Sequence, residues 1–260
     1  KDLRKRYAPQ TAPNDQLILK AVKAFEKSKK PILYSGGGVV NSGEQASKLI
    51  RKLVAESDFP ITSTLMGLGC YPASGENWLG MLGMHGTYEA NMAMHDCDFM
   101  FCIGARFDDR ITGKTDEFSP NSVKVHIDID PSSINKNILV DIGIIGDISM
   151  SLDKFLQVWR ERGAKTNKNG LKSWWQEIQT WKKIDCLNFK NDTRTIKPQY
   201  ALQILEKLTK TMDRYVTTEV GQHQMWAAQF MGFEEPRRWM TSGGLGTMGY
   251  GFPASIGVQI

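Results

Sequence analysis

The sequence predicts an α/β fold, with a parallel sheet covered by helices and the start of a second α/β domain behind it. Short apolar runs alternate with segments of helical period, and most apolar runs end in Gly, Asp or Arg. Strands buried on both faces of a parallel sheet are apolar throughout. In open sheets of this Rossmann-like kind, ligands bind outside the carboxyl ends of the strands, so polar residues at these ends mark the candidate site.

The elements follow one another regularly in the first part of the chain. Residues 16–28 carry apolar side chains at helical spacing and predict a helix capped by Asn14 or Asp15. Residues 31–35 predict a strand that runs into three glycines, and helical period returns over residues 42–56. Further strands are predicted within residues 59–67, 98–109, 124–131 and 142–147, with a closing helix over residues 147–162.

The pattern divides the chain into four parts. Residues 1–15 are predicted as a linker, residues 16–163 as a central domain, residues 164–195 as a connecting segment, and residues 196–260 as the truncated start of a second domain. The connecting segment is rich in Lys and Asn, and its tryptophans are expected to pack on a neighbouring surface. The chain begins with Lys and stops inside an apolar helix, so we expect it to be a piece of a longer protein.

Composition argues against several functions. The formal net charge is +5, but the first 30 residues hold nine Lys and Arg against three acids, and the rest hold 24 against 25. This excess indicates a solvated leading segment and no nucleic-acid surface. No stretch approaches the ~18 continuous apolar residues of a membrane span. The four cysteines form no CxxC pair, so we expect buried free thiols, a reducing cytoplasm and no metal site.

Two candidate ligand-binding loops follow predicted strands. Residues 36–38 are three glycines, which let a backbone approach a phosphate at a helix N-terminus, although such glycines also occur where a chain only turns. Residues 104–110, GARFDDR, place two arginines and two aspartates directly after a buried strand. They suit a phosphate and sugar hydroxyls, or they form a self-satisfied ion-pair loop.

Two further segments complete this edge. Asp128 stands at a strand end, where dinucleotide-binding folds hold a sugar hydroxyl. Asp130, before a proline, is expected to cap a turn or helix, and His126 to be a satisfied core histidine. Residues 79–91 combine glycines, methionines and a histidine, which predicts a flexible loop suited to lying along a flat ring system.

The last candidate lies in the second domain. Residues 220–226 follow a predicted strand, and the glycine-rich residues 242–251 precede a predicted helix. Two such strand-to-helix crossings would form a diphosphate cradle. His223 is either a general acid or base or a loop residue that only hydrogen-bonds.

Several of these motifs together resemble one family. STLMGLG, GMLGMHGTYEAN, GARFDDRITGK, VHIDIDPSSINKN, VGQHQMWAAQF and SGGLGTMGYGFPASIG closely resemble the catalytic large subunit of acetolactate synthase, also called acetohydroxyacid synthase. The resemblance runs from about residue 31 to residue 260 and is least within residues 151–195. It implies a central FAD-binding domain and the opening of a thiamine-diphosphate domain.

The resemblance also implies an activity for the complete protein: decarboxylation of pyruvate and its condensation with a second 2-oxo acid, in branched-chain amino-acid synthesis. FAD would be structural. The Mg²⁺ ligands and the glutamate that activates thiamine diphosphate lie outside this chain, so we expect it to be inactive alone. A homodimer or tetramer and a regulatory small subunit are expected. The alternatives are another FAD-containing carboligase or oxo-acid decarboxylase, or a nucleotide-binding module without catalysis.

Carried over residue by residue, the resemblance implies the following sites. On the thiamine side, Gly246 and Met248 are the catalytic candidates, and Gln222, His223 and Thr247 are cofactor contacts. Arg4 and Arg6 are further candidates for FAD. The main FAD contacts are Gly37, Thr64, Leu65, Leu82, Gly83, Met84, His85, Gly104, Ala105, Arg106, Phe107, Asp108, Arg110, Asp128, Ile129 and Asp147.

Overall fold

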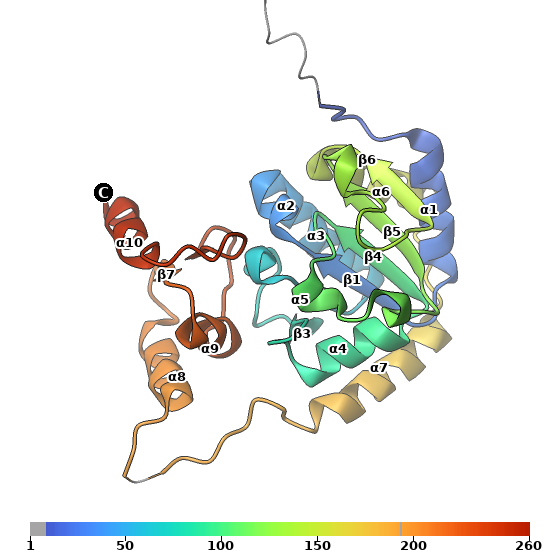
Figure 1. Ribbon diagram of the computed structural model, residues 1–260. Helices are drawn as coiled ribbons and strands as arrows, with labels where there is room; N and C mark the ends of the chain where they lie inside the picture. Colours follow the sequence, from blue (N-terminus) through green and yellow to red (C-terminus); the bar gives the residue numbers. More distant parts are fainter. Residues whose placement is uncertain (1–8, 193) are drawn as a thin grey trace, which may run out of the picture.

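The computed structural model describes residues 9–192 and 194–260, which form two lobes joined by an extended segment (Figure 1). Arg4 and Arg6 lie outside the described residues. The central lobe, residues 9–182, is built on six parallel strands in the order β3-β2-β1-β4-β5-β6, which confirms the predicted sheet. The strands are β1 (Pro31–Ser35), β2 (Ile61–Ser63), β3 (Trp78–Met81), β4 (Phe99–Ile103), β5 (Val123–Asp128) and β6 (Ile142–Ile145).

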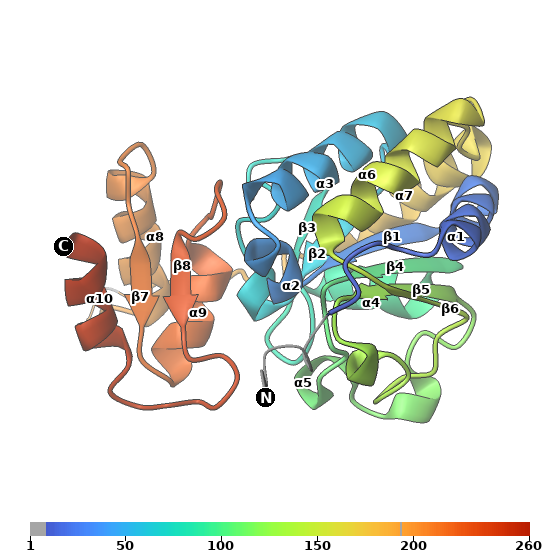
Figure 2. The same cartoon turned by 90° about the horizontal axis from the view of Figure 1, so that it is seen from above.

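Helices cover both faces of this sheet (Figure 2). Helices α1, α3 and α6 pack together on one face, and α4 lies on the other with α7 beside it. The chain leaves β1 in one direction and returns to its other side at β4, so right-handed crossovers place α3 and α4 on opposite faces. The helices are α1 (Asp15–Lys27), α2 (Gly37–Asn41), α3 (Glu44–Ser57), α4 (Tyr88–Asp96), α5 (Asp109–Thr112), α6 (Ile148–Glu161) and α7 (Lys168–Lys182), with 3-10 turns η2 (Leu65–Gly67), η3 (Thr115–Glu117) and η4 (Pro131–Ser133).

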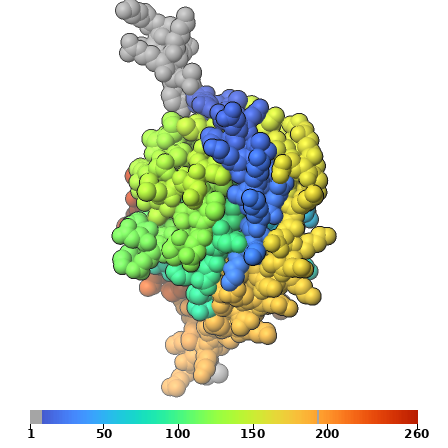
Figure 3. Space-filling view, turned by 90° about the vertical axis from the view of Figure 1, so that its right-hand side faces the viewer, coloured from blue at the N-terminus to red at the C-terminus, as the bar shows by residue number. Residues whose placement is uncertain are grey.

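The core of the central lobe gathers around aromatic rings. Asn14, one of the two predicted caps, caps α1 by accepting hydrogen bonds from two backbone N–H groups. The apolar stripe of α1 then buries Phe25, whose ring meets those of Phe155 and Trp159 edge-on, at centroid distances of 5.2 and 5.0 Å. Seen from outside, the α1 region forms a blue band between green and yellow segments of the chain (Figure 3).

The predicted connecting segment contributes to this core. Its helix α7 buries Trp174, whose indole N–H donates to the carbonyl of Pro31 at 2.9 Å. Trp175 donates in the same way to Asp58, also at 2.9 Å. These indoles satisfy the carbonyls of the chain entering β1 and leaving α3, so α7 is an integral helix of the central lobe.

The C-terminal lobe, residues 198–260, holds a two-stranded parallel sheet between three helices. As predicted, a strand precedes residues 220–226 and a helix follows the glycine-rich residues 242–251. Its elements are α8 (Pro198–Thr209), β7 (Val216–Thr218), α9 (Gln222–Phe230), β8 (Trp239–Thr241) and α10 (Gly251–Gln259).

Several sequence-based expectations were wrong. Residues 79–91 were predicted as a loop, but they contain most of β3 and the start of α4, which begins when Thr87 caps it. The glycines and methionines hid the period-2 pattern of β3. Strand β8 has only three residues and was not predicted. Cys186 is exposed, although all four cysteines were expected to be buried; Cys70 is buried, and burial raises the pKa of its thiol to about 12.

Within residues 9–192 and 194–260, no helix is long and apolar enough to cross a bilayer.

Candidate nucleotide and diphosphate sites

The strand order reverses between β1 and β4, and glycines stand on both sides of this point. The N–H of Gly38 donates to the carbonyl of Gly104 at 2.9 Å. A Cβ built on Gly36 would lie 2.2 Å from the same carbonyl oxygen, so Gly36 and Gly38 serve close packing of the two loops. Gly37 is partly exposed between them. A crevice at such a reversal is where open α/β sheets bind ligands.

The loop after β4 turns its charged residues outward. Phe107 has a left-handed backbone, with φ at +53°, and its ring is buried against Tyr34 and His126. Ala105 is buried as well. On either side of Phe107 in the sequence, Arg106 is exposed and Asp108 is partly exposed, and the two form an ion pair of 2.9 Å. The loop therefore forms the ion pair of the second alternative, and because this pair is solvated, redirecting its charges to a ligand costs little.

Asp128 is the last residue of β5, and its side chain stabilises the turn that follows the strand. One carboxylate oxygen accepts from the N–H of Asp130 at 2.8 Å, and the other lies 3.8 Å from a ring nitrogen of His126. Asp130 caps η4, as predicted. Ile129 is 43% exposed, so its side chain contributes apolar surface at this edge.

His126 differs from the expectation. It is buried, but neither ring nitrogen has a hydrogen-bond partner among the described residues, so it is not a satisfied core histidine. Burial lowers its pKa, and the nearby carboxylate of Asp128 only partly opposes this. The ring is therefore neutral, and Phe107 packs against it edge-on.

Asp147 has a structural duty at the same edge. It caps α6 by accepting from the N–H of Met150 at 3.1 Å. Its second oxygen accepts from the hydroxyl of Ser42 at 2.7 Å. Asp147 therefore joins the chain after β6 to the residue after α2, and both its oxygens are engaged within the lobe.

Two loops extend the crevice over β2 and β3. Thr64 caps η2, and Leu65 follows it at the end of β2; both are partly exposed. The second loop consists of Leu82, Gly83, Met84 and His85. In it, Leu82 and Gly83 are buried, while Met84 and His85 point outward. The N–H of Met84 donates to the carbonyl of Arg110 at 2.8 Å, which joins this loop to the end of GARFDDR.

Asn91, which sequence reasoning left without a role, holds the second loop. Its carboxamide accepts from the N–H of Gly83 at 2.8 Å and donates to the carbonyl of the same residue at 3.0 Å. Gly83 has φ at +97°, a conformation that glycine adopts readily. In the sequence, an Asn eight residues after a Gly is too common a pattern to predict this contact.

The C-terminal lobe offers a different kind of site. Helix α9 begins at Gln222 after Gly221, and no side chain caps it. Gln222 and His223 are exposed in its first turn. The N–H groups of an uncapped first turn attract an anion.

The second predicted crossing is closed. The carboxylate of Glu219 accepts from the N–H groups of Gly251 at 2.7 Å and Phe252 at 3.2 Å, and also from Gly249. Glu219 thus occupies the N-terminus of α10, where the sequence predicted half of a diphosphate cradle. The N-terminus of α9, next to β7, has no side-chain cap, so of the two predicted crossings it is the one that leaves its first N–H groups open to an anion.

The loop between β8 and α10 is therefore held at one end and open along its length. Gly246 is exposed with φ at +66°. Thr247 is exposed and donates its N–H to the hydroxyl of Ser242 at 2.9 Å. Met248 is 80% exposed, so an apolar side chain stands free for a ligand or another part of the protein.

The two groups of candidate residues meet at one point. A Cβ built on Gly243, in the loop after β8, would lie 2.4 Å from the sulfur of Met66, which follows Leu65. A Cβ on Gly37 would lie 3.1 Å from the Cβ of the same methionine. Met66 therefore lies between the crevice of the central lobe and the glycine-rich loop of the C-terminal lobe.

This geometry defines a class of protein: an α/β protein with charged and glycine-rich loops at the carboxyl edge of a parallel sheet in one lobe, and an uncapped helix N-terminus beside a glycine-rich loop in the next. Comparison with known families specifies the class. Residues 18–155 match the central domain of thiamine pyrophosphate enzymes, and residues 219–260 match their C-terminal TPP-binding domain. The chain belongs to the thiamine pyrophosphate enzyme family.

Individual proteins similar to this chain include several acetolactate synthases. The chain is 44% identical over 254 residues to the acetolactate synthase isozyme 3 large subunit of Escherichia coli K12. It is 47% identical over 254 residues to the acetolactate synthase large subunit of Haemophilus influenzae, and 44% identical over 248 residues to the chloroplastic acetolactate synthase 2 of Nicotiana tabacum. The alignments cover 98%, 98% and 95% of this chain but 44%, 44% and 36% of the relatives, so the chain spans less than half of their length.

Proposed function

We propose that the protein containing this chain is a thiamine-diphosphate-dependent acetolactate synthase. It would decarboxylate pyruvate and condense the product with a second 2-oxo acid, giving the precursors of branched-chain amino acids. The observation that carries this proposal is the identity of 44–47% to acetolactate synthase large subunits over 98% of the chain. The site geometry in both lobes is consistent with it.

The crevice of the central lobe suits FAD. The exposed guanidinium groups of Arg106 and Arg110 would hold the diphosphate, and Asp128 would accept from a ribose hydroxyl. Gly37 lets a ligand approach the backbone, and the loop ending at His85 offers Met84 as a flexible apolar contact. Since the reaction has no net redox change, we propose a structural role for FAD.

The C-terminal lobe suits thiamine diphosphate. When bound, this cofactor supplies an electron sink for the decarboxylation of 2-oxo acids. The open first turn of α9, with Gln222 and His223, would hold the diphosphate together with Mg²⁺. The exposed carbonyl of Gly246 would accept from the aminopyrimidine, Thr247 would line the same face, and Met248 would support the bent cofactor.

The proposal extends to assembly and location. We propose at least a homodimer for the full-length protein, with a regulatory small subunit as a further partner, since several relatives are named large subunits. The cysteines of this chain are free, which is consistent with a reducing cytoplasm.

The deciding experiment uses the full-length protein. Purified enzyme incubated with pyruvate should form acetolactate only when thiamine diphosphate and Mg²⁺ are both present, and it should carry a flavin absorbance that turnover leaves unchanged. A product formed from glyoxylate in place of acetolactate would indicate another FAD-containing carboligase. Nucleotide binding without any thiamine-dependent product would indicate a nucleotide-binding module and would overturn the proposal.

A further inference from the structure

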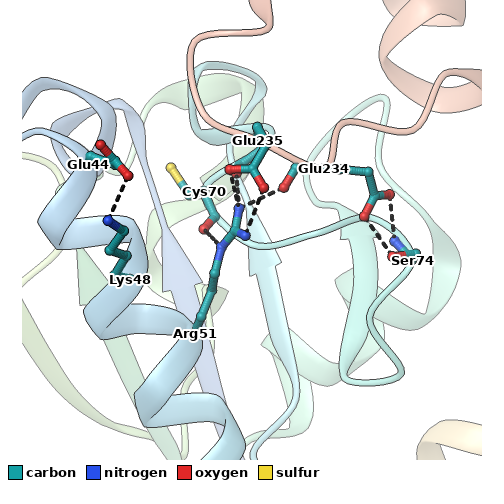
Figure 4. Close-up of polar contacts among 8 residues, drawn as sticks. Glu44, Lys48, Arg51, Cys70, Ser74, Glu234 and Glu235 are labelled. Carbon is teal, nitrogen blue, oxygen red and sulfur yellow. Dashed lines mark hydrogen bonds and ion pairs between the residues drawn. The ribbon is translucent and has the colours of Figure 1, made fainter. Parts of the chain in front are cut away.

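Besides apolar contact, several hydrogen bonds join the two lobes, and most of those made by a single side chain belong to one arginine. Arg51 lies on α3 of the central lobe and reaches across to the segment between α9 and β8 (Figure 4). Its guanidinium donates to the carbonyl of Glu234 at 2.6 Å and to both carboxylate oxygens of Glu235, at 3.2 and 3.3 Å. It also donates, at longer range, to the carbonyl of Gly69 in its own lobe. One side chain therefore ties backbone from both lobes.

The central lobe encloses the same segment from the other side. The N–H of Ala73 donates to the carbonyl of Phe233 at 3.1 Å. Ser74 donates its N–H and its hydroxyl to the two carboxylate oxygens of Glu234, at 3.0 and 2.6 Å (Figure 4). Gly69 and the segment at Glu235 pack so closely that a Cβ built on Gly69 would lie 2.2 Å from the carbonyl oxygen of Glu235.

Apolar packing alone would leave the lobes free to slide. The buried cluster at the junction joins Leu68 and Met81 of the central lobe to residues around α9 and β8. Burial of such a cluster is non-directional and does not define one orientation. The arginine fork and the paired hydrogen bonds of Ser74 are directional, as is the bond from the carboxamide of Gln229 to the carbonyl of His85 at 2.9 Å, so together they restrict the angle between the lobes.

The clamped segment connects the two elements that carry the proposed thiamine-side residues. It follows α9, whose first turn holds Gln222 and His223, and it precedes β8, which leads to Gly246 and Met248. We propose that Arg51 is a positioning residue: by fixing the segment 233–236 on α3, it sets the thiamine-side loop against the flavin-side crevice. This inference rests on the proposed function for its effect on cofactor binding, but not for its effect on the junction.

The test compares variants of the full-length protein. Arg51→Ala removes the fork, and Arg51→Lys keeps the charge but has only one donor head. Gly69→Ala wedges the same joint from the opposite side and leaves the arginine side chain in place. Arg160→Ala is the matched control, because Arg160 makes a similar two-pronged ion pair with Glu56 inside the central lobe. The readouts are hydrogen exchange at the amides of Ala73 and Ser74, flavin content, and the thiamine diphosphate concentration that gives half-maximal activity.

We expect Arg51→Ala and Gly69→Ala to accelerate exchange at both amides and to raise the half-saturating thiamine diphosphate concentration roughly tenfold, which corresponds to one charge-assisted hydrogen bond. Flavin content should stay unchanged, Arg51→Lys should be intermediate, and Arg160→Ala should behave as the parent protein. A purely stabilising arginine would lower flavin content and maximal activity together, with no selective change in thiamine affinity.

Two results would overturn the inference. Exchange at Ala73 and Ser74 that is the same in Arg51→Ala as in Arg160→Ala would show that Arg51 does not hold the junction. Faster exchange with an unchanged half-saturating concentration would show that the joint does not position the site. If the parent protein has no thiamine-dependent activity, the proposed function is wrong. Hydrogen exchange at Ala73 and Ser74 then still tests whether Arg51 holds the junction.

Discussion

The ring of Phe107 stands edge-on to the imidazole of His126, with the ring centroids 5.1 Å apart and the planes at 80°. This contact explains how GARFDDR can present its charges. The phenyl ring goes down into the lobe, the backbone takes a left-handed turn, and Arg106 and Asp108 come to lie outward. The sequence-based site included Phe107 as a cofactor contact, but its buried side chain can reach a ligand only through the loop that it anchors.

The anchor and the strained backbone can be separated by mutation. Phe107→Ala should destabilise the protein by about 3–5 kcal/mol, because it removes a buried ring. Phe107→Gly removes the same ring but tolerates the positive φ, so it should be more stable than the alanine variant by about 0.5–1 kcal/mol. Denaturant unfolding of both variants tests this order. An alanine variant as stable as or more stable than the glycine variant would show that the left-handed turn is not maintained against strain.

His126 predicts a pH dependence of stability. Its pKa is lowered in the folded protein by burial, so the unfolded chain takes up a proton first as pH falls. Stability is therefore fully present above the unfolded-state pKa of about 6.5 and declines below it toward the lower folded-state pKa.

His126→Leu should flatten the part of the stability profile that lies below about pH 6.5. Unfolding free energies measured between about pH 5 and 8 would show it, and the exposed His95 replaced by Gln serves as the control. An unaltered slope in His126→Leu would contradict a buried neutral imidazole.

Glu219 predicts a selective effect on the C-terminal lobe. Desolvation raises the pKa of this carboxyl, but hydrogen bonds from the N–H groups of Phe252, Gly249 and Gly251 together lower the pKa below its usual value. Its contribution is thus present above the unfolded-state pKa of about 4.3 and is lost as pH falls through the folded-state pKa.

Glu219→Ala opens the N-terminus of α10 and frees the loop that carries Gly246 and Met248. The half-saturating concentration of thiamine diphosphate should rise several-fold, on the order of one lost charge-assisted contact, while flavin content stays constant. Glu44→Gln, at an exposed helical ion pair with Lys48, is the control. An unchanged thiamine affinity would mean that the loop keeps its shape without this carboxylate.

The sequence predicted the sheet and its ligand edge because both depend on local patterns. Strand β4 can be recognised because it is apolar from Phe99 to Ile103, and the charged loop that follows it can be recognised by its composition. What could not be predicted depends on partners distant in the chain. Whether Glu219 occupies a helix terminus 32 residues later, or whether Arg51 reaches Glu234, is decided by packing that no local period encodes. Strand β3 was not predicted for a different reason: it has four residues, one of them a glycine, and only Leu79 and Met81 are buried.

Asn91 offers the sharpest test of the proposed flavin site. Its carboxamide makes two hydrogen bonds to the single residue Gly83, one as donor and one as acceptor. Asn91→Asp keeps the shape and the acceptor, but it places a carboxylate against the carbonyl of Gly83, which loses its donor. The loop from Leu82 to His85 should loosen, and flavin should bind roughly tenfold more weakly, as measured by the fluorescence of released flavin on dilution. Asn121→Asp, at an exposed position outside the crevice, should retain flavin as the parent does. Equal retention by both variants would mean that this loop takes no part in holding the flavin.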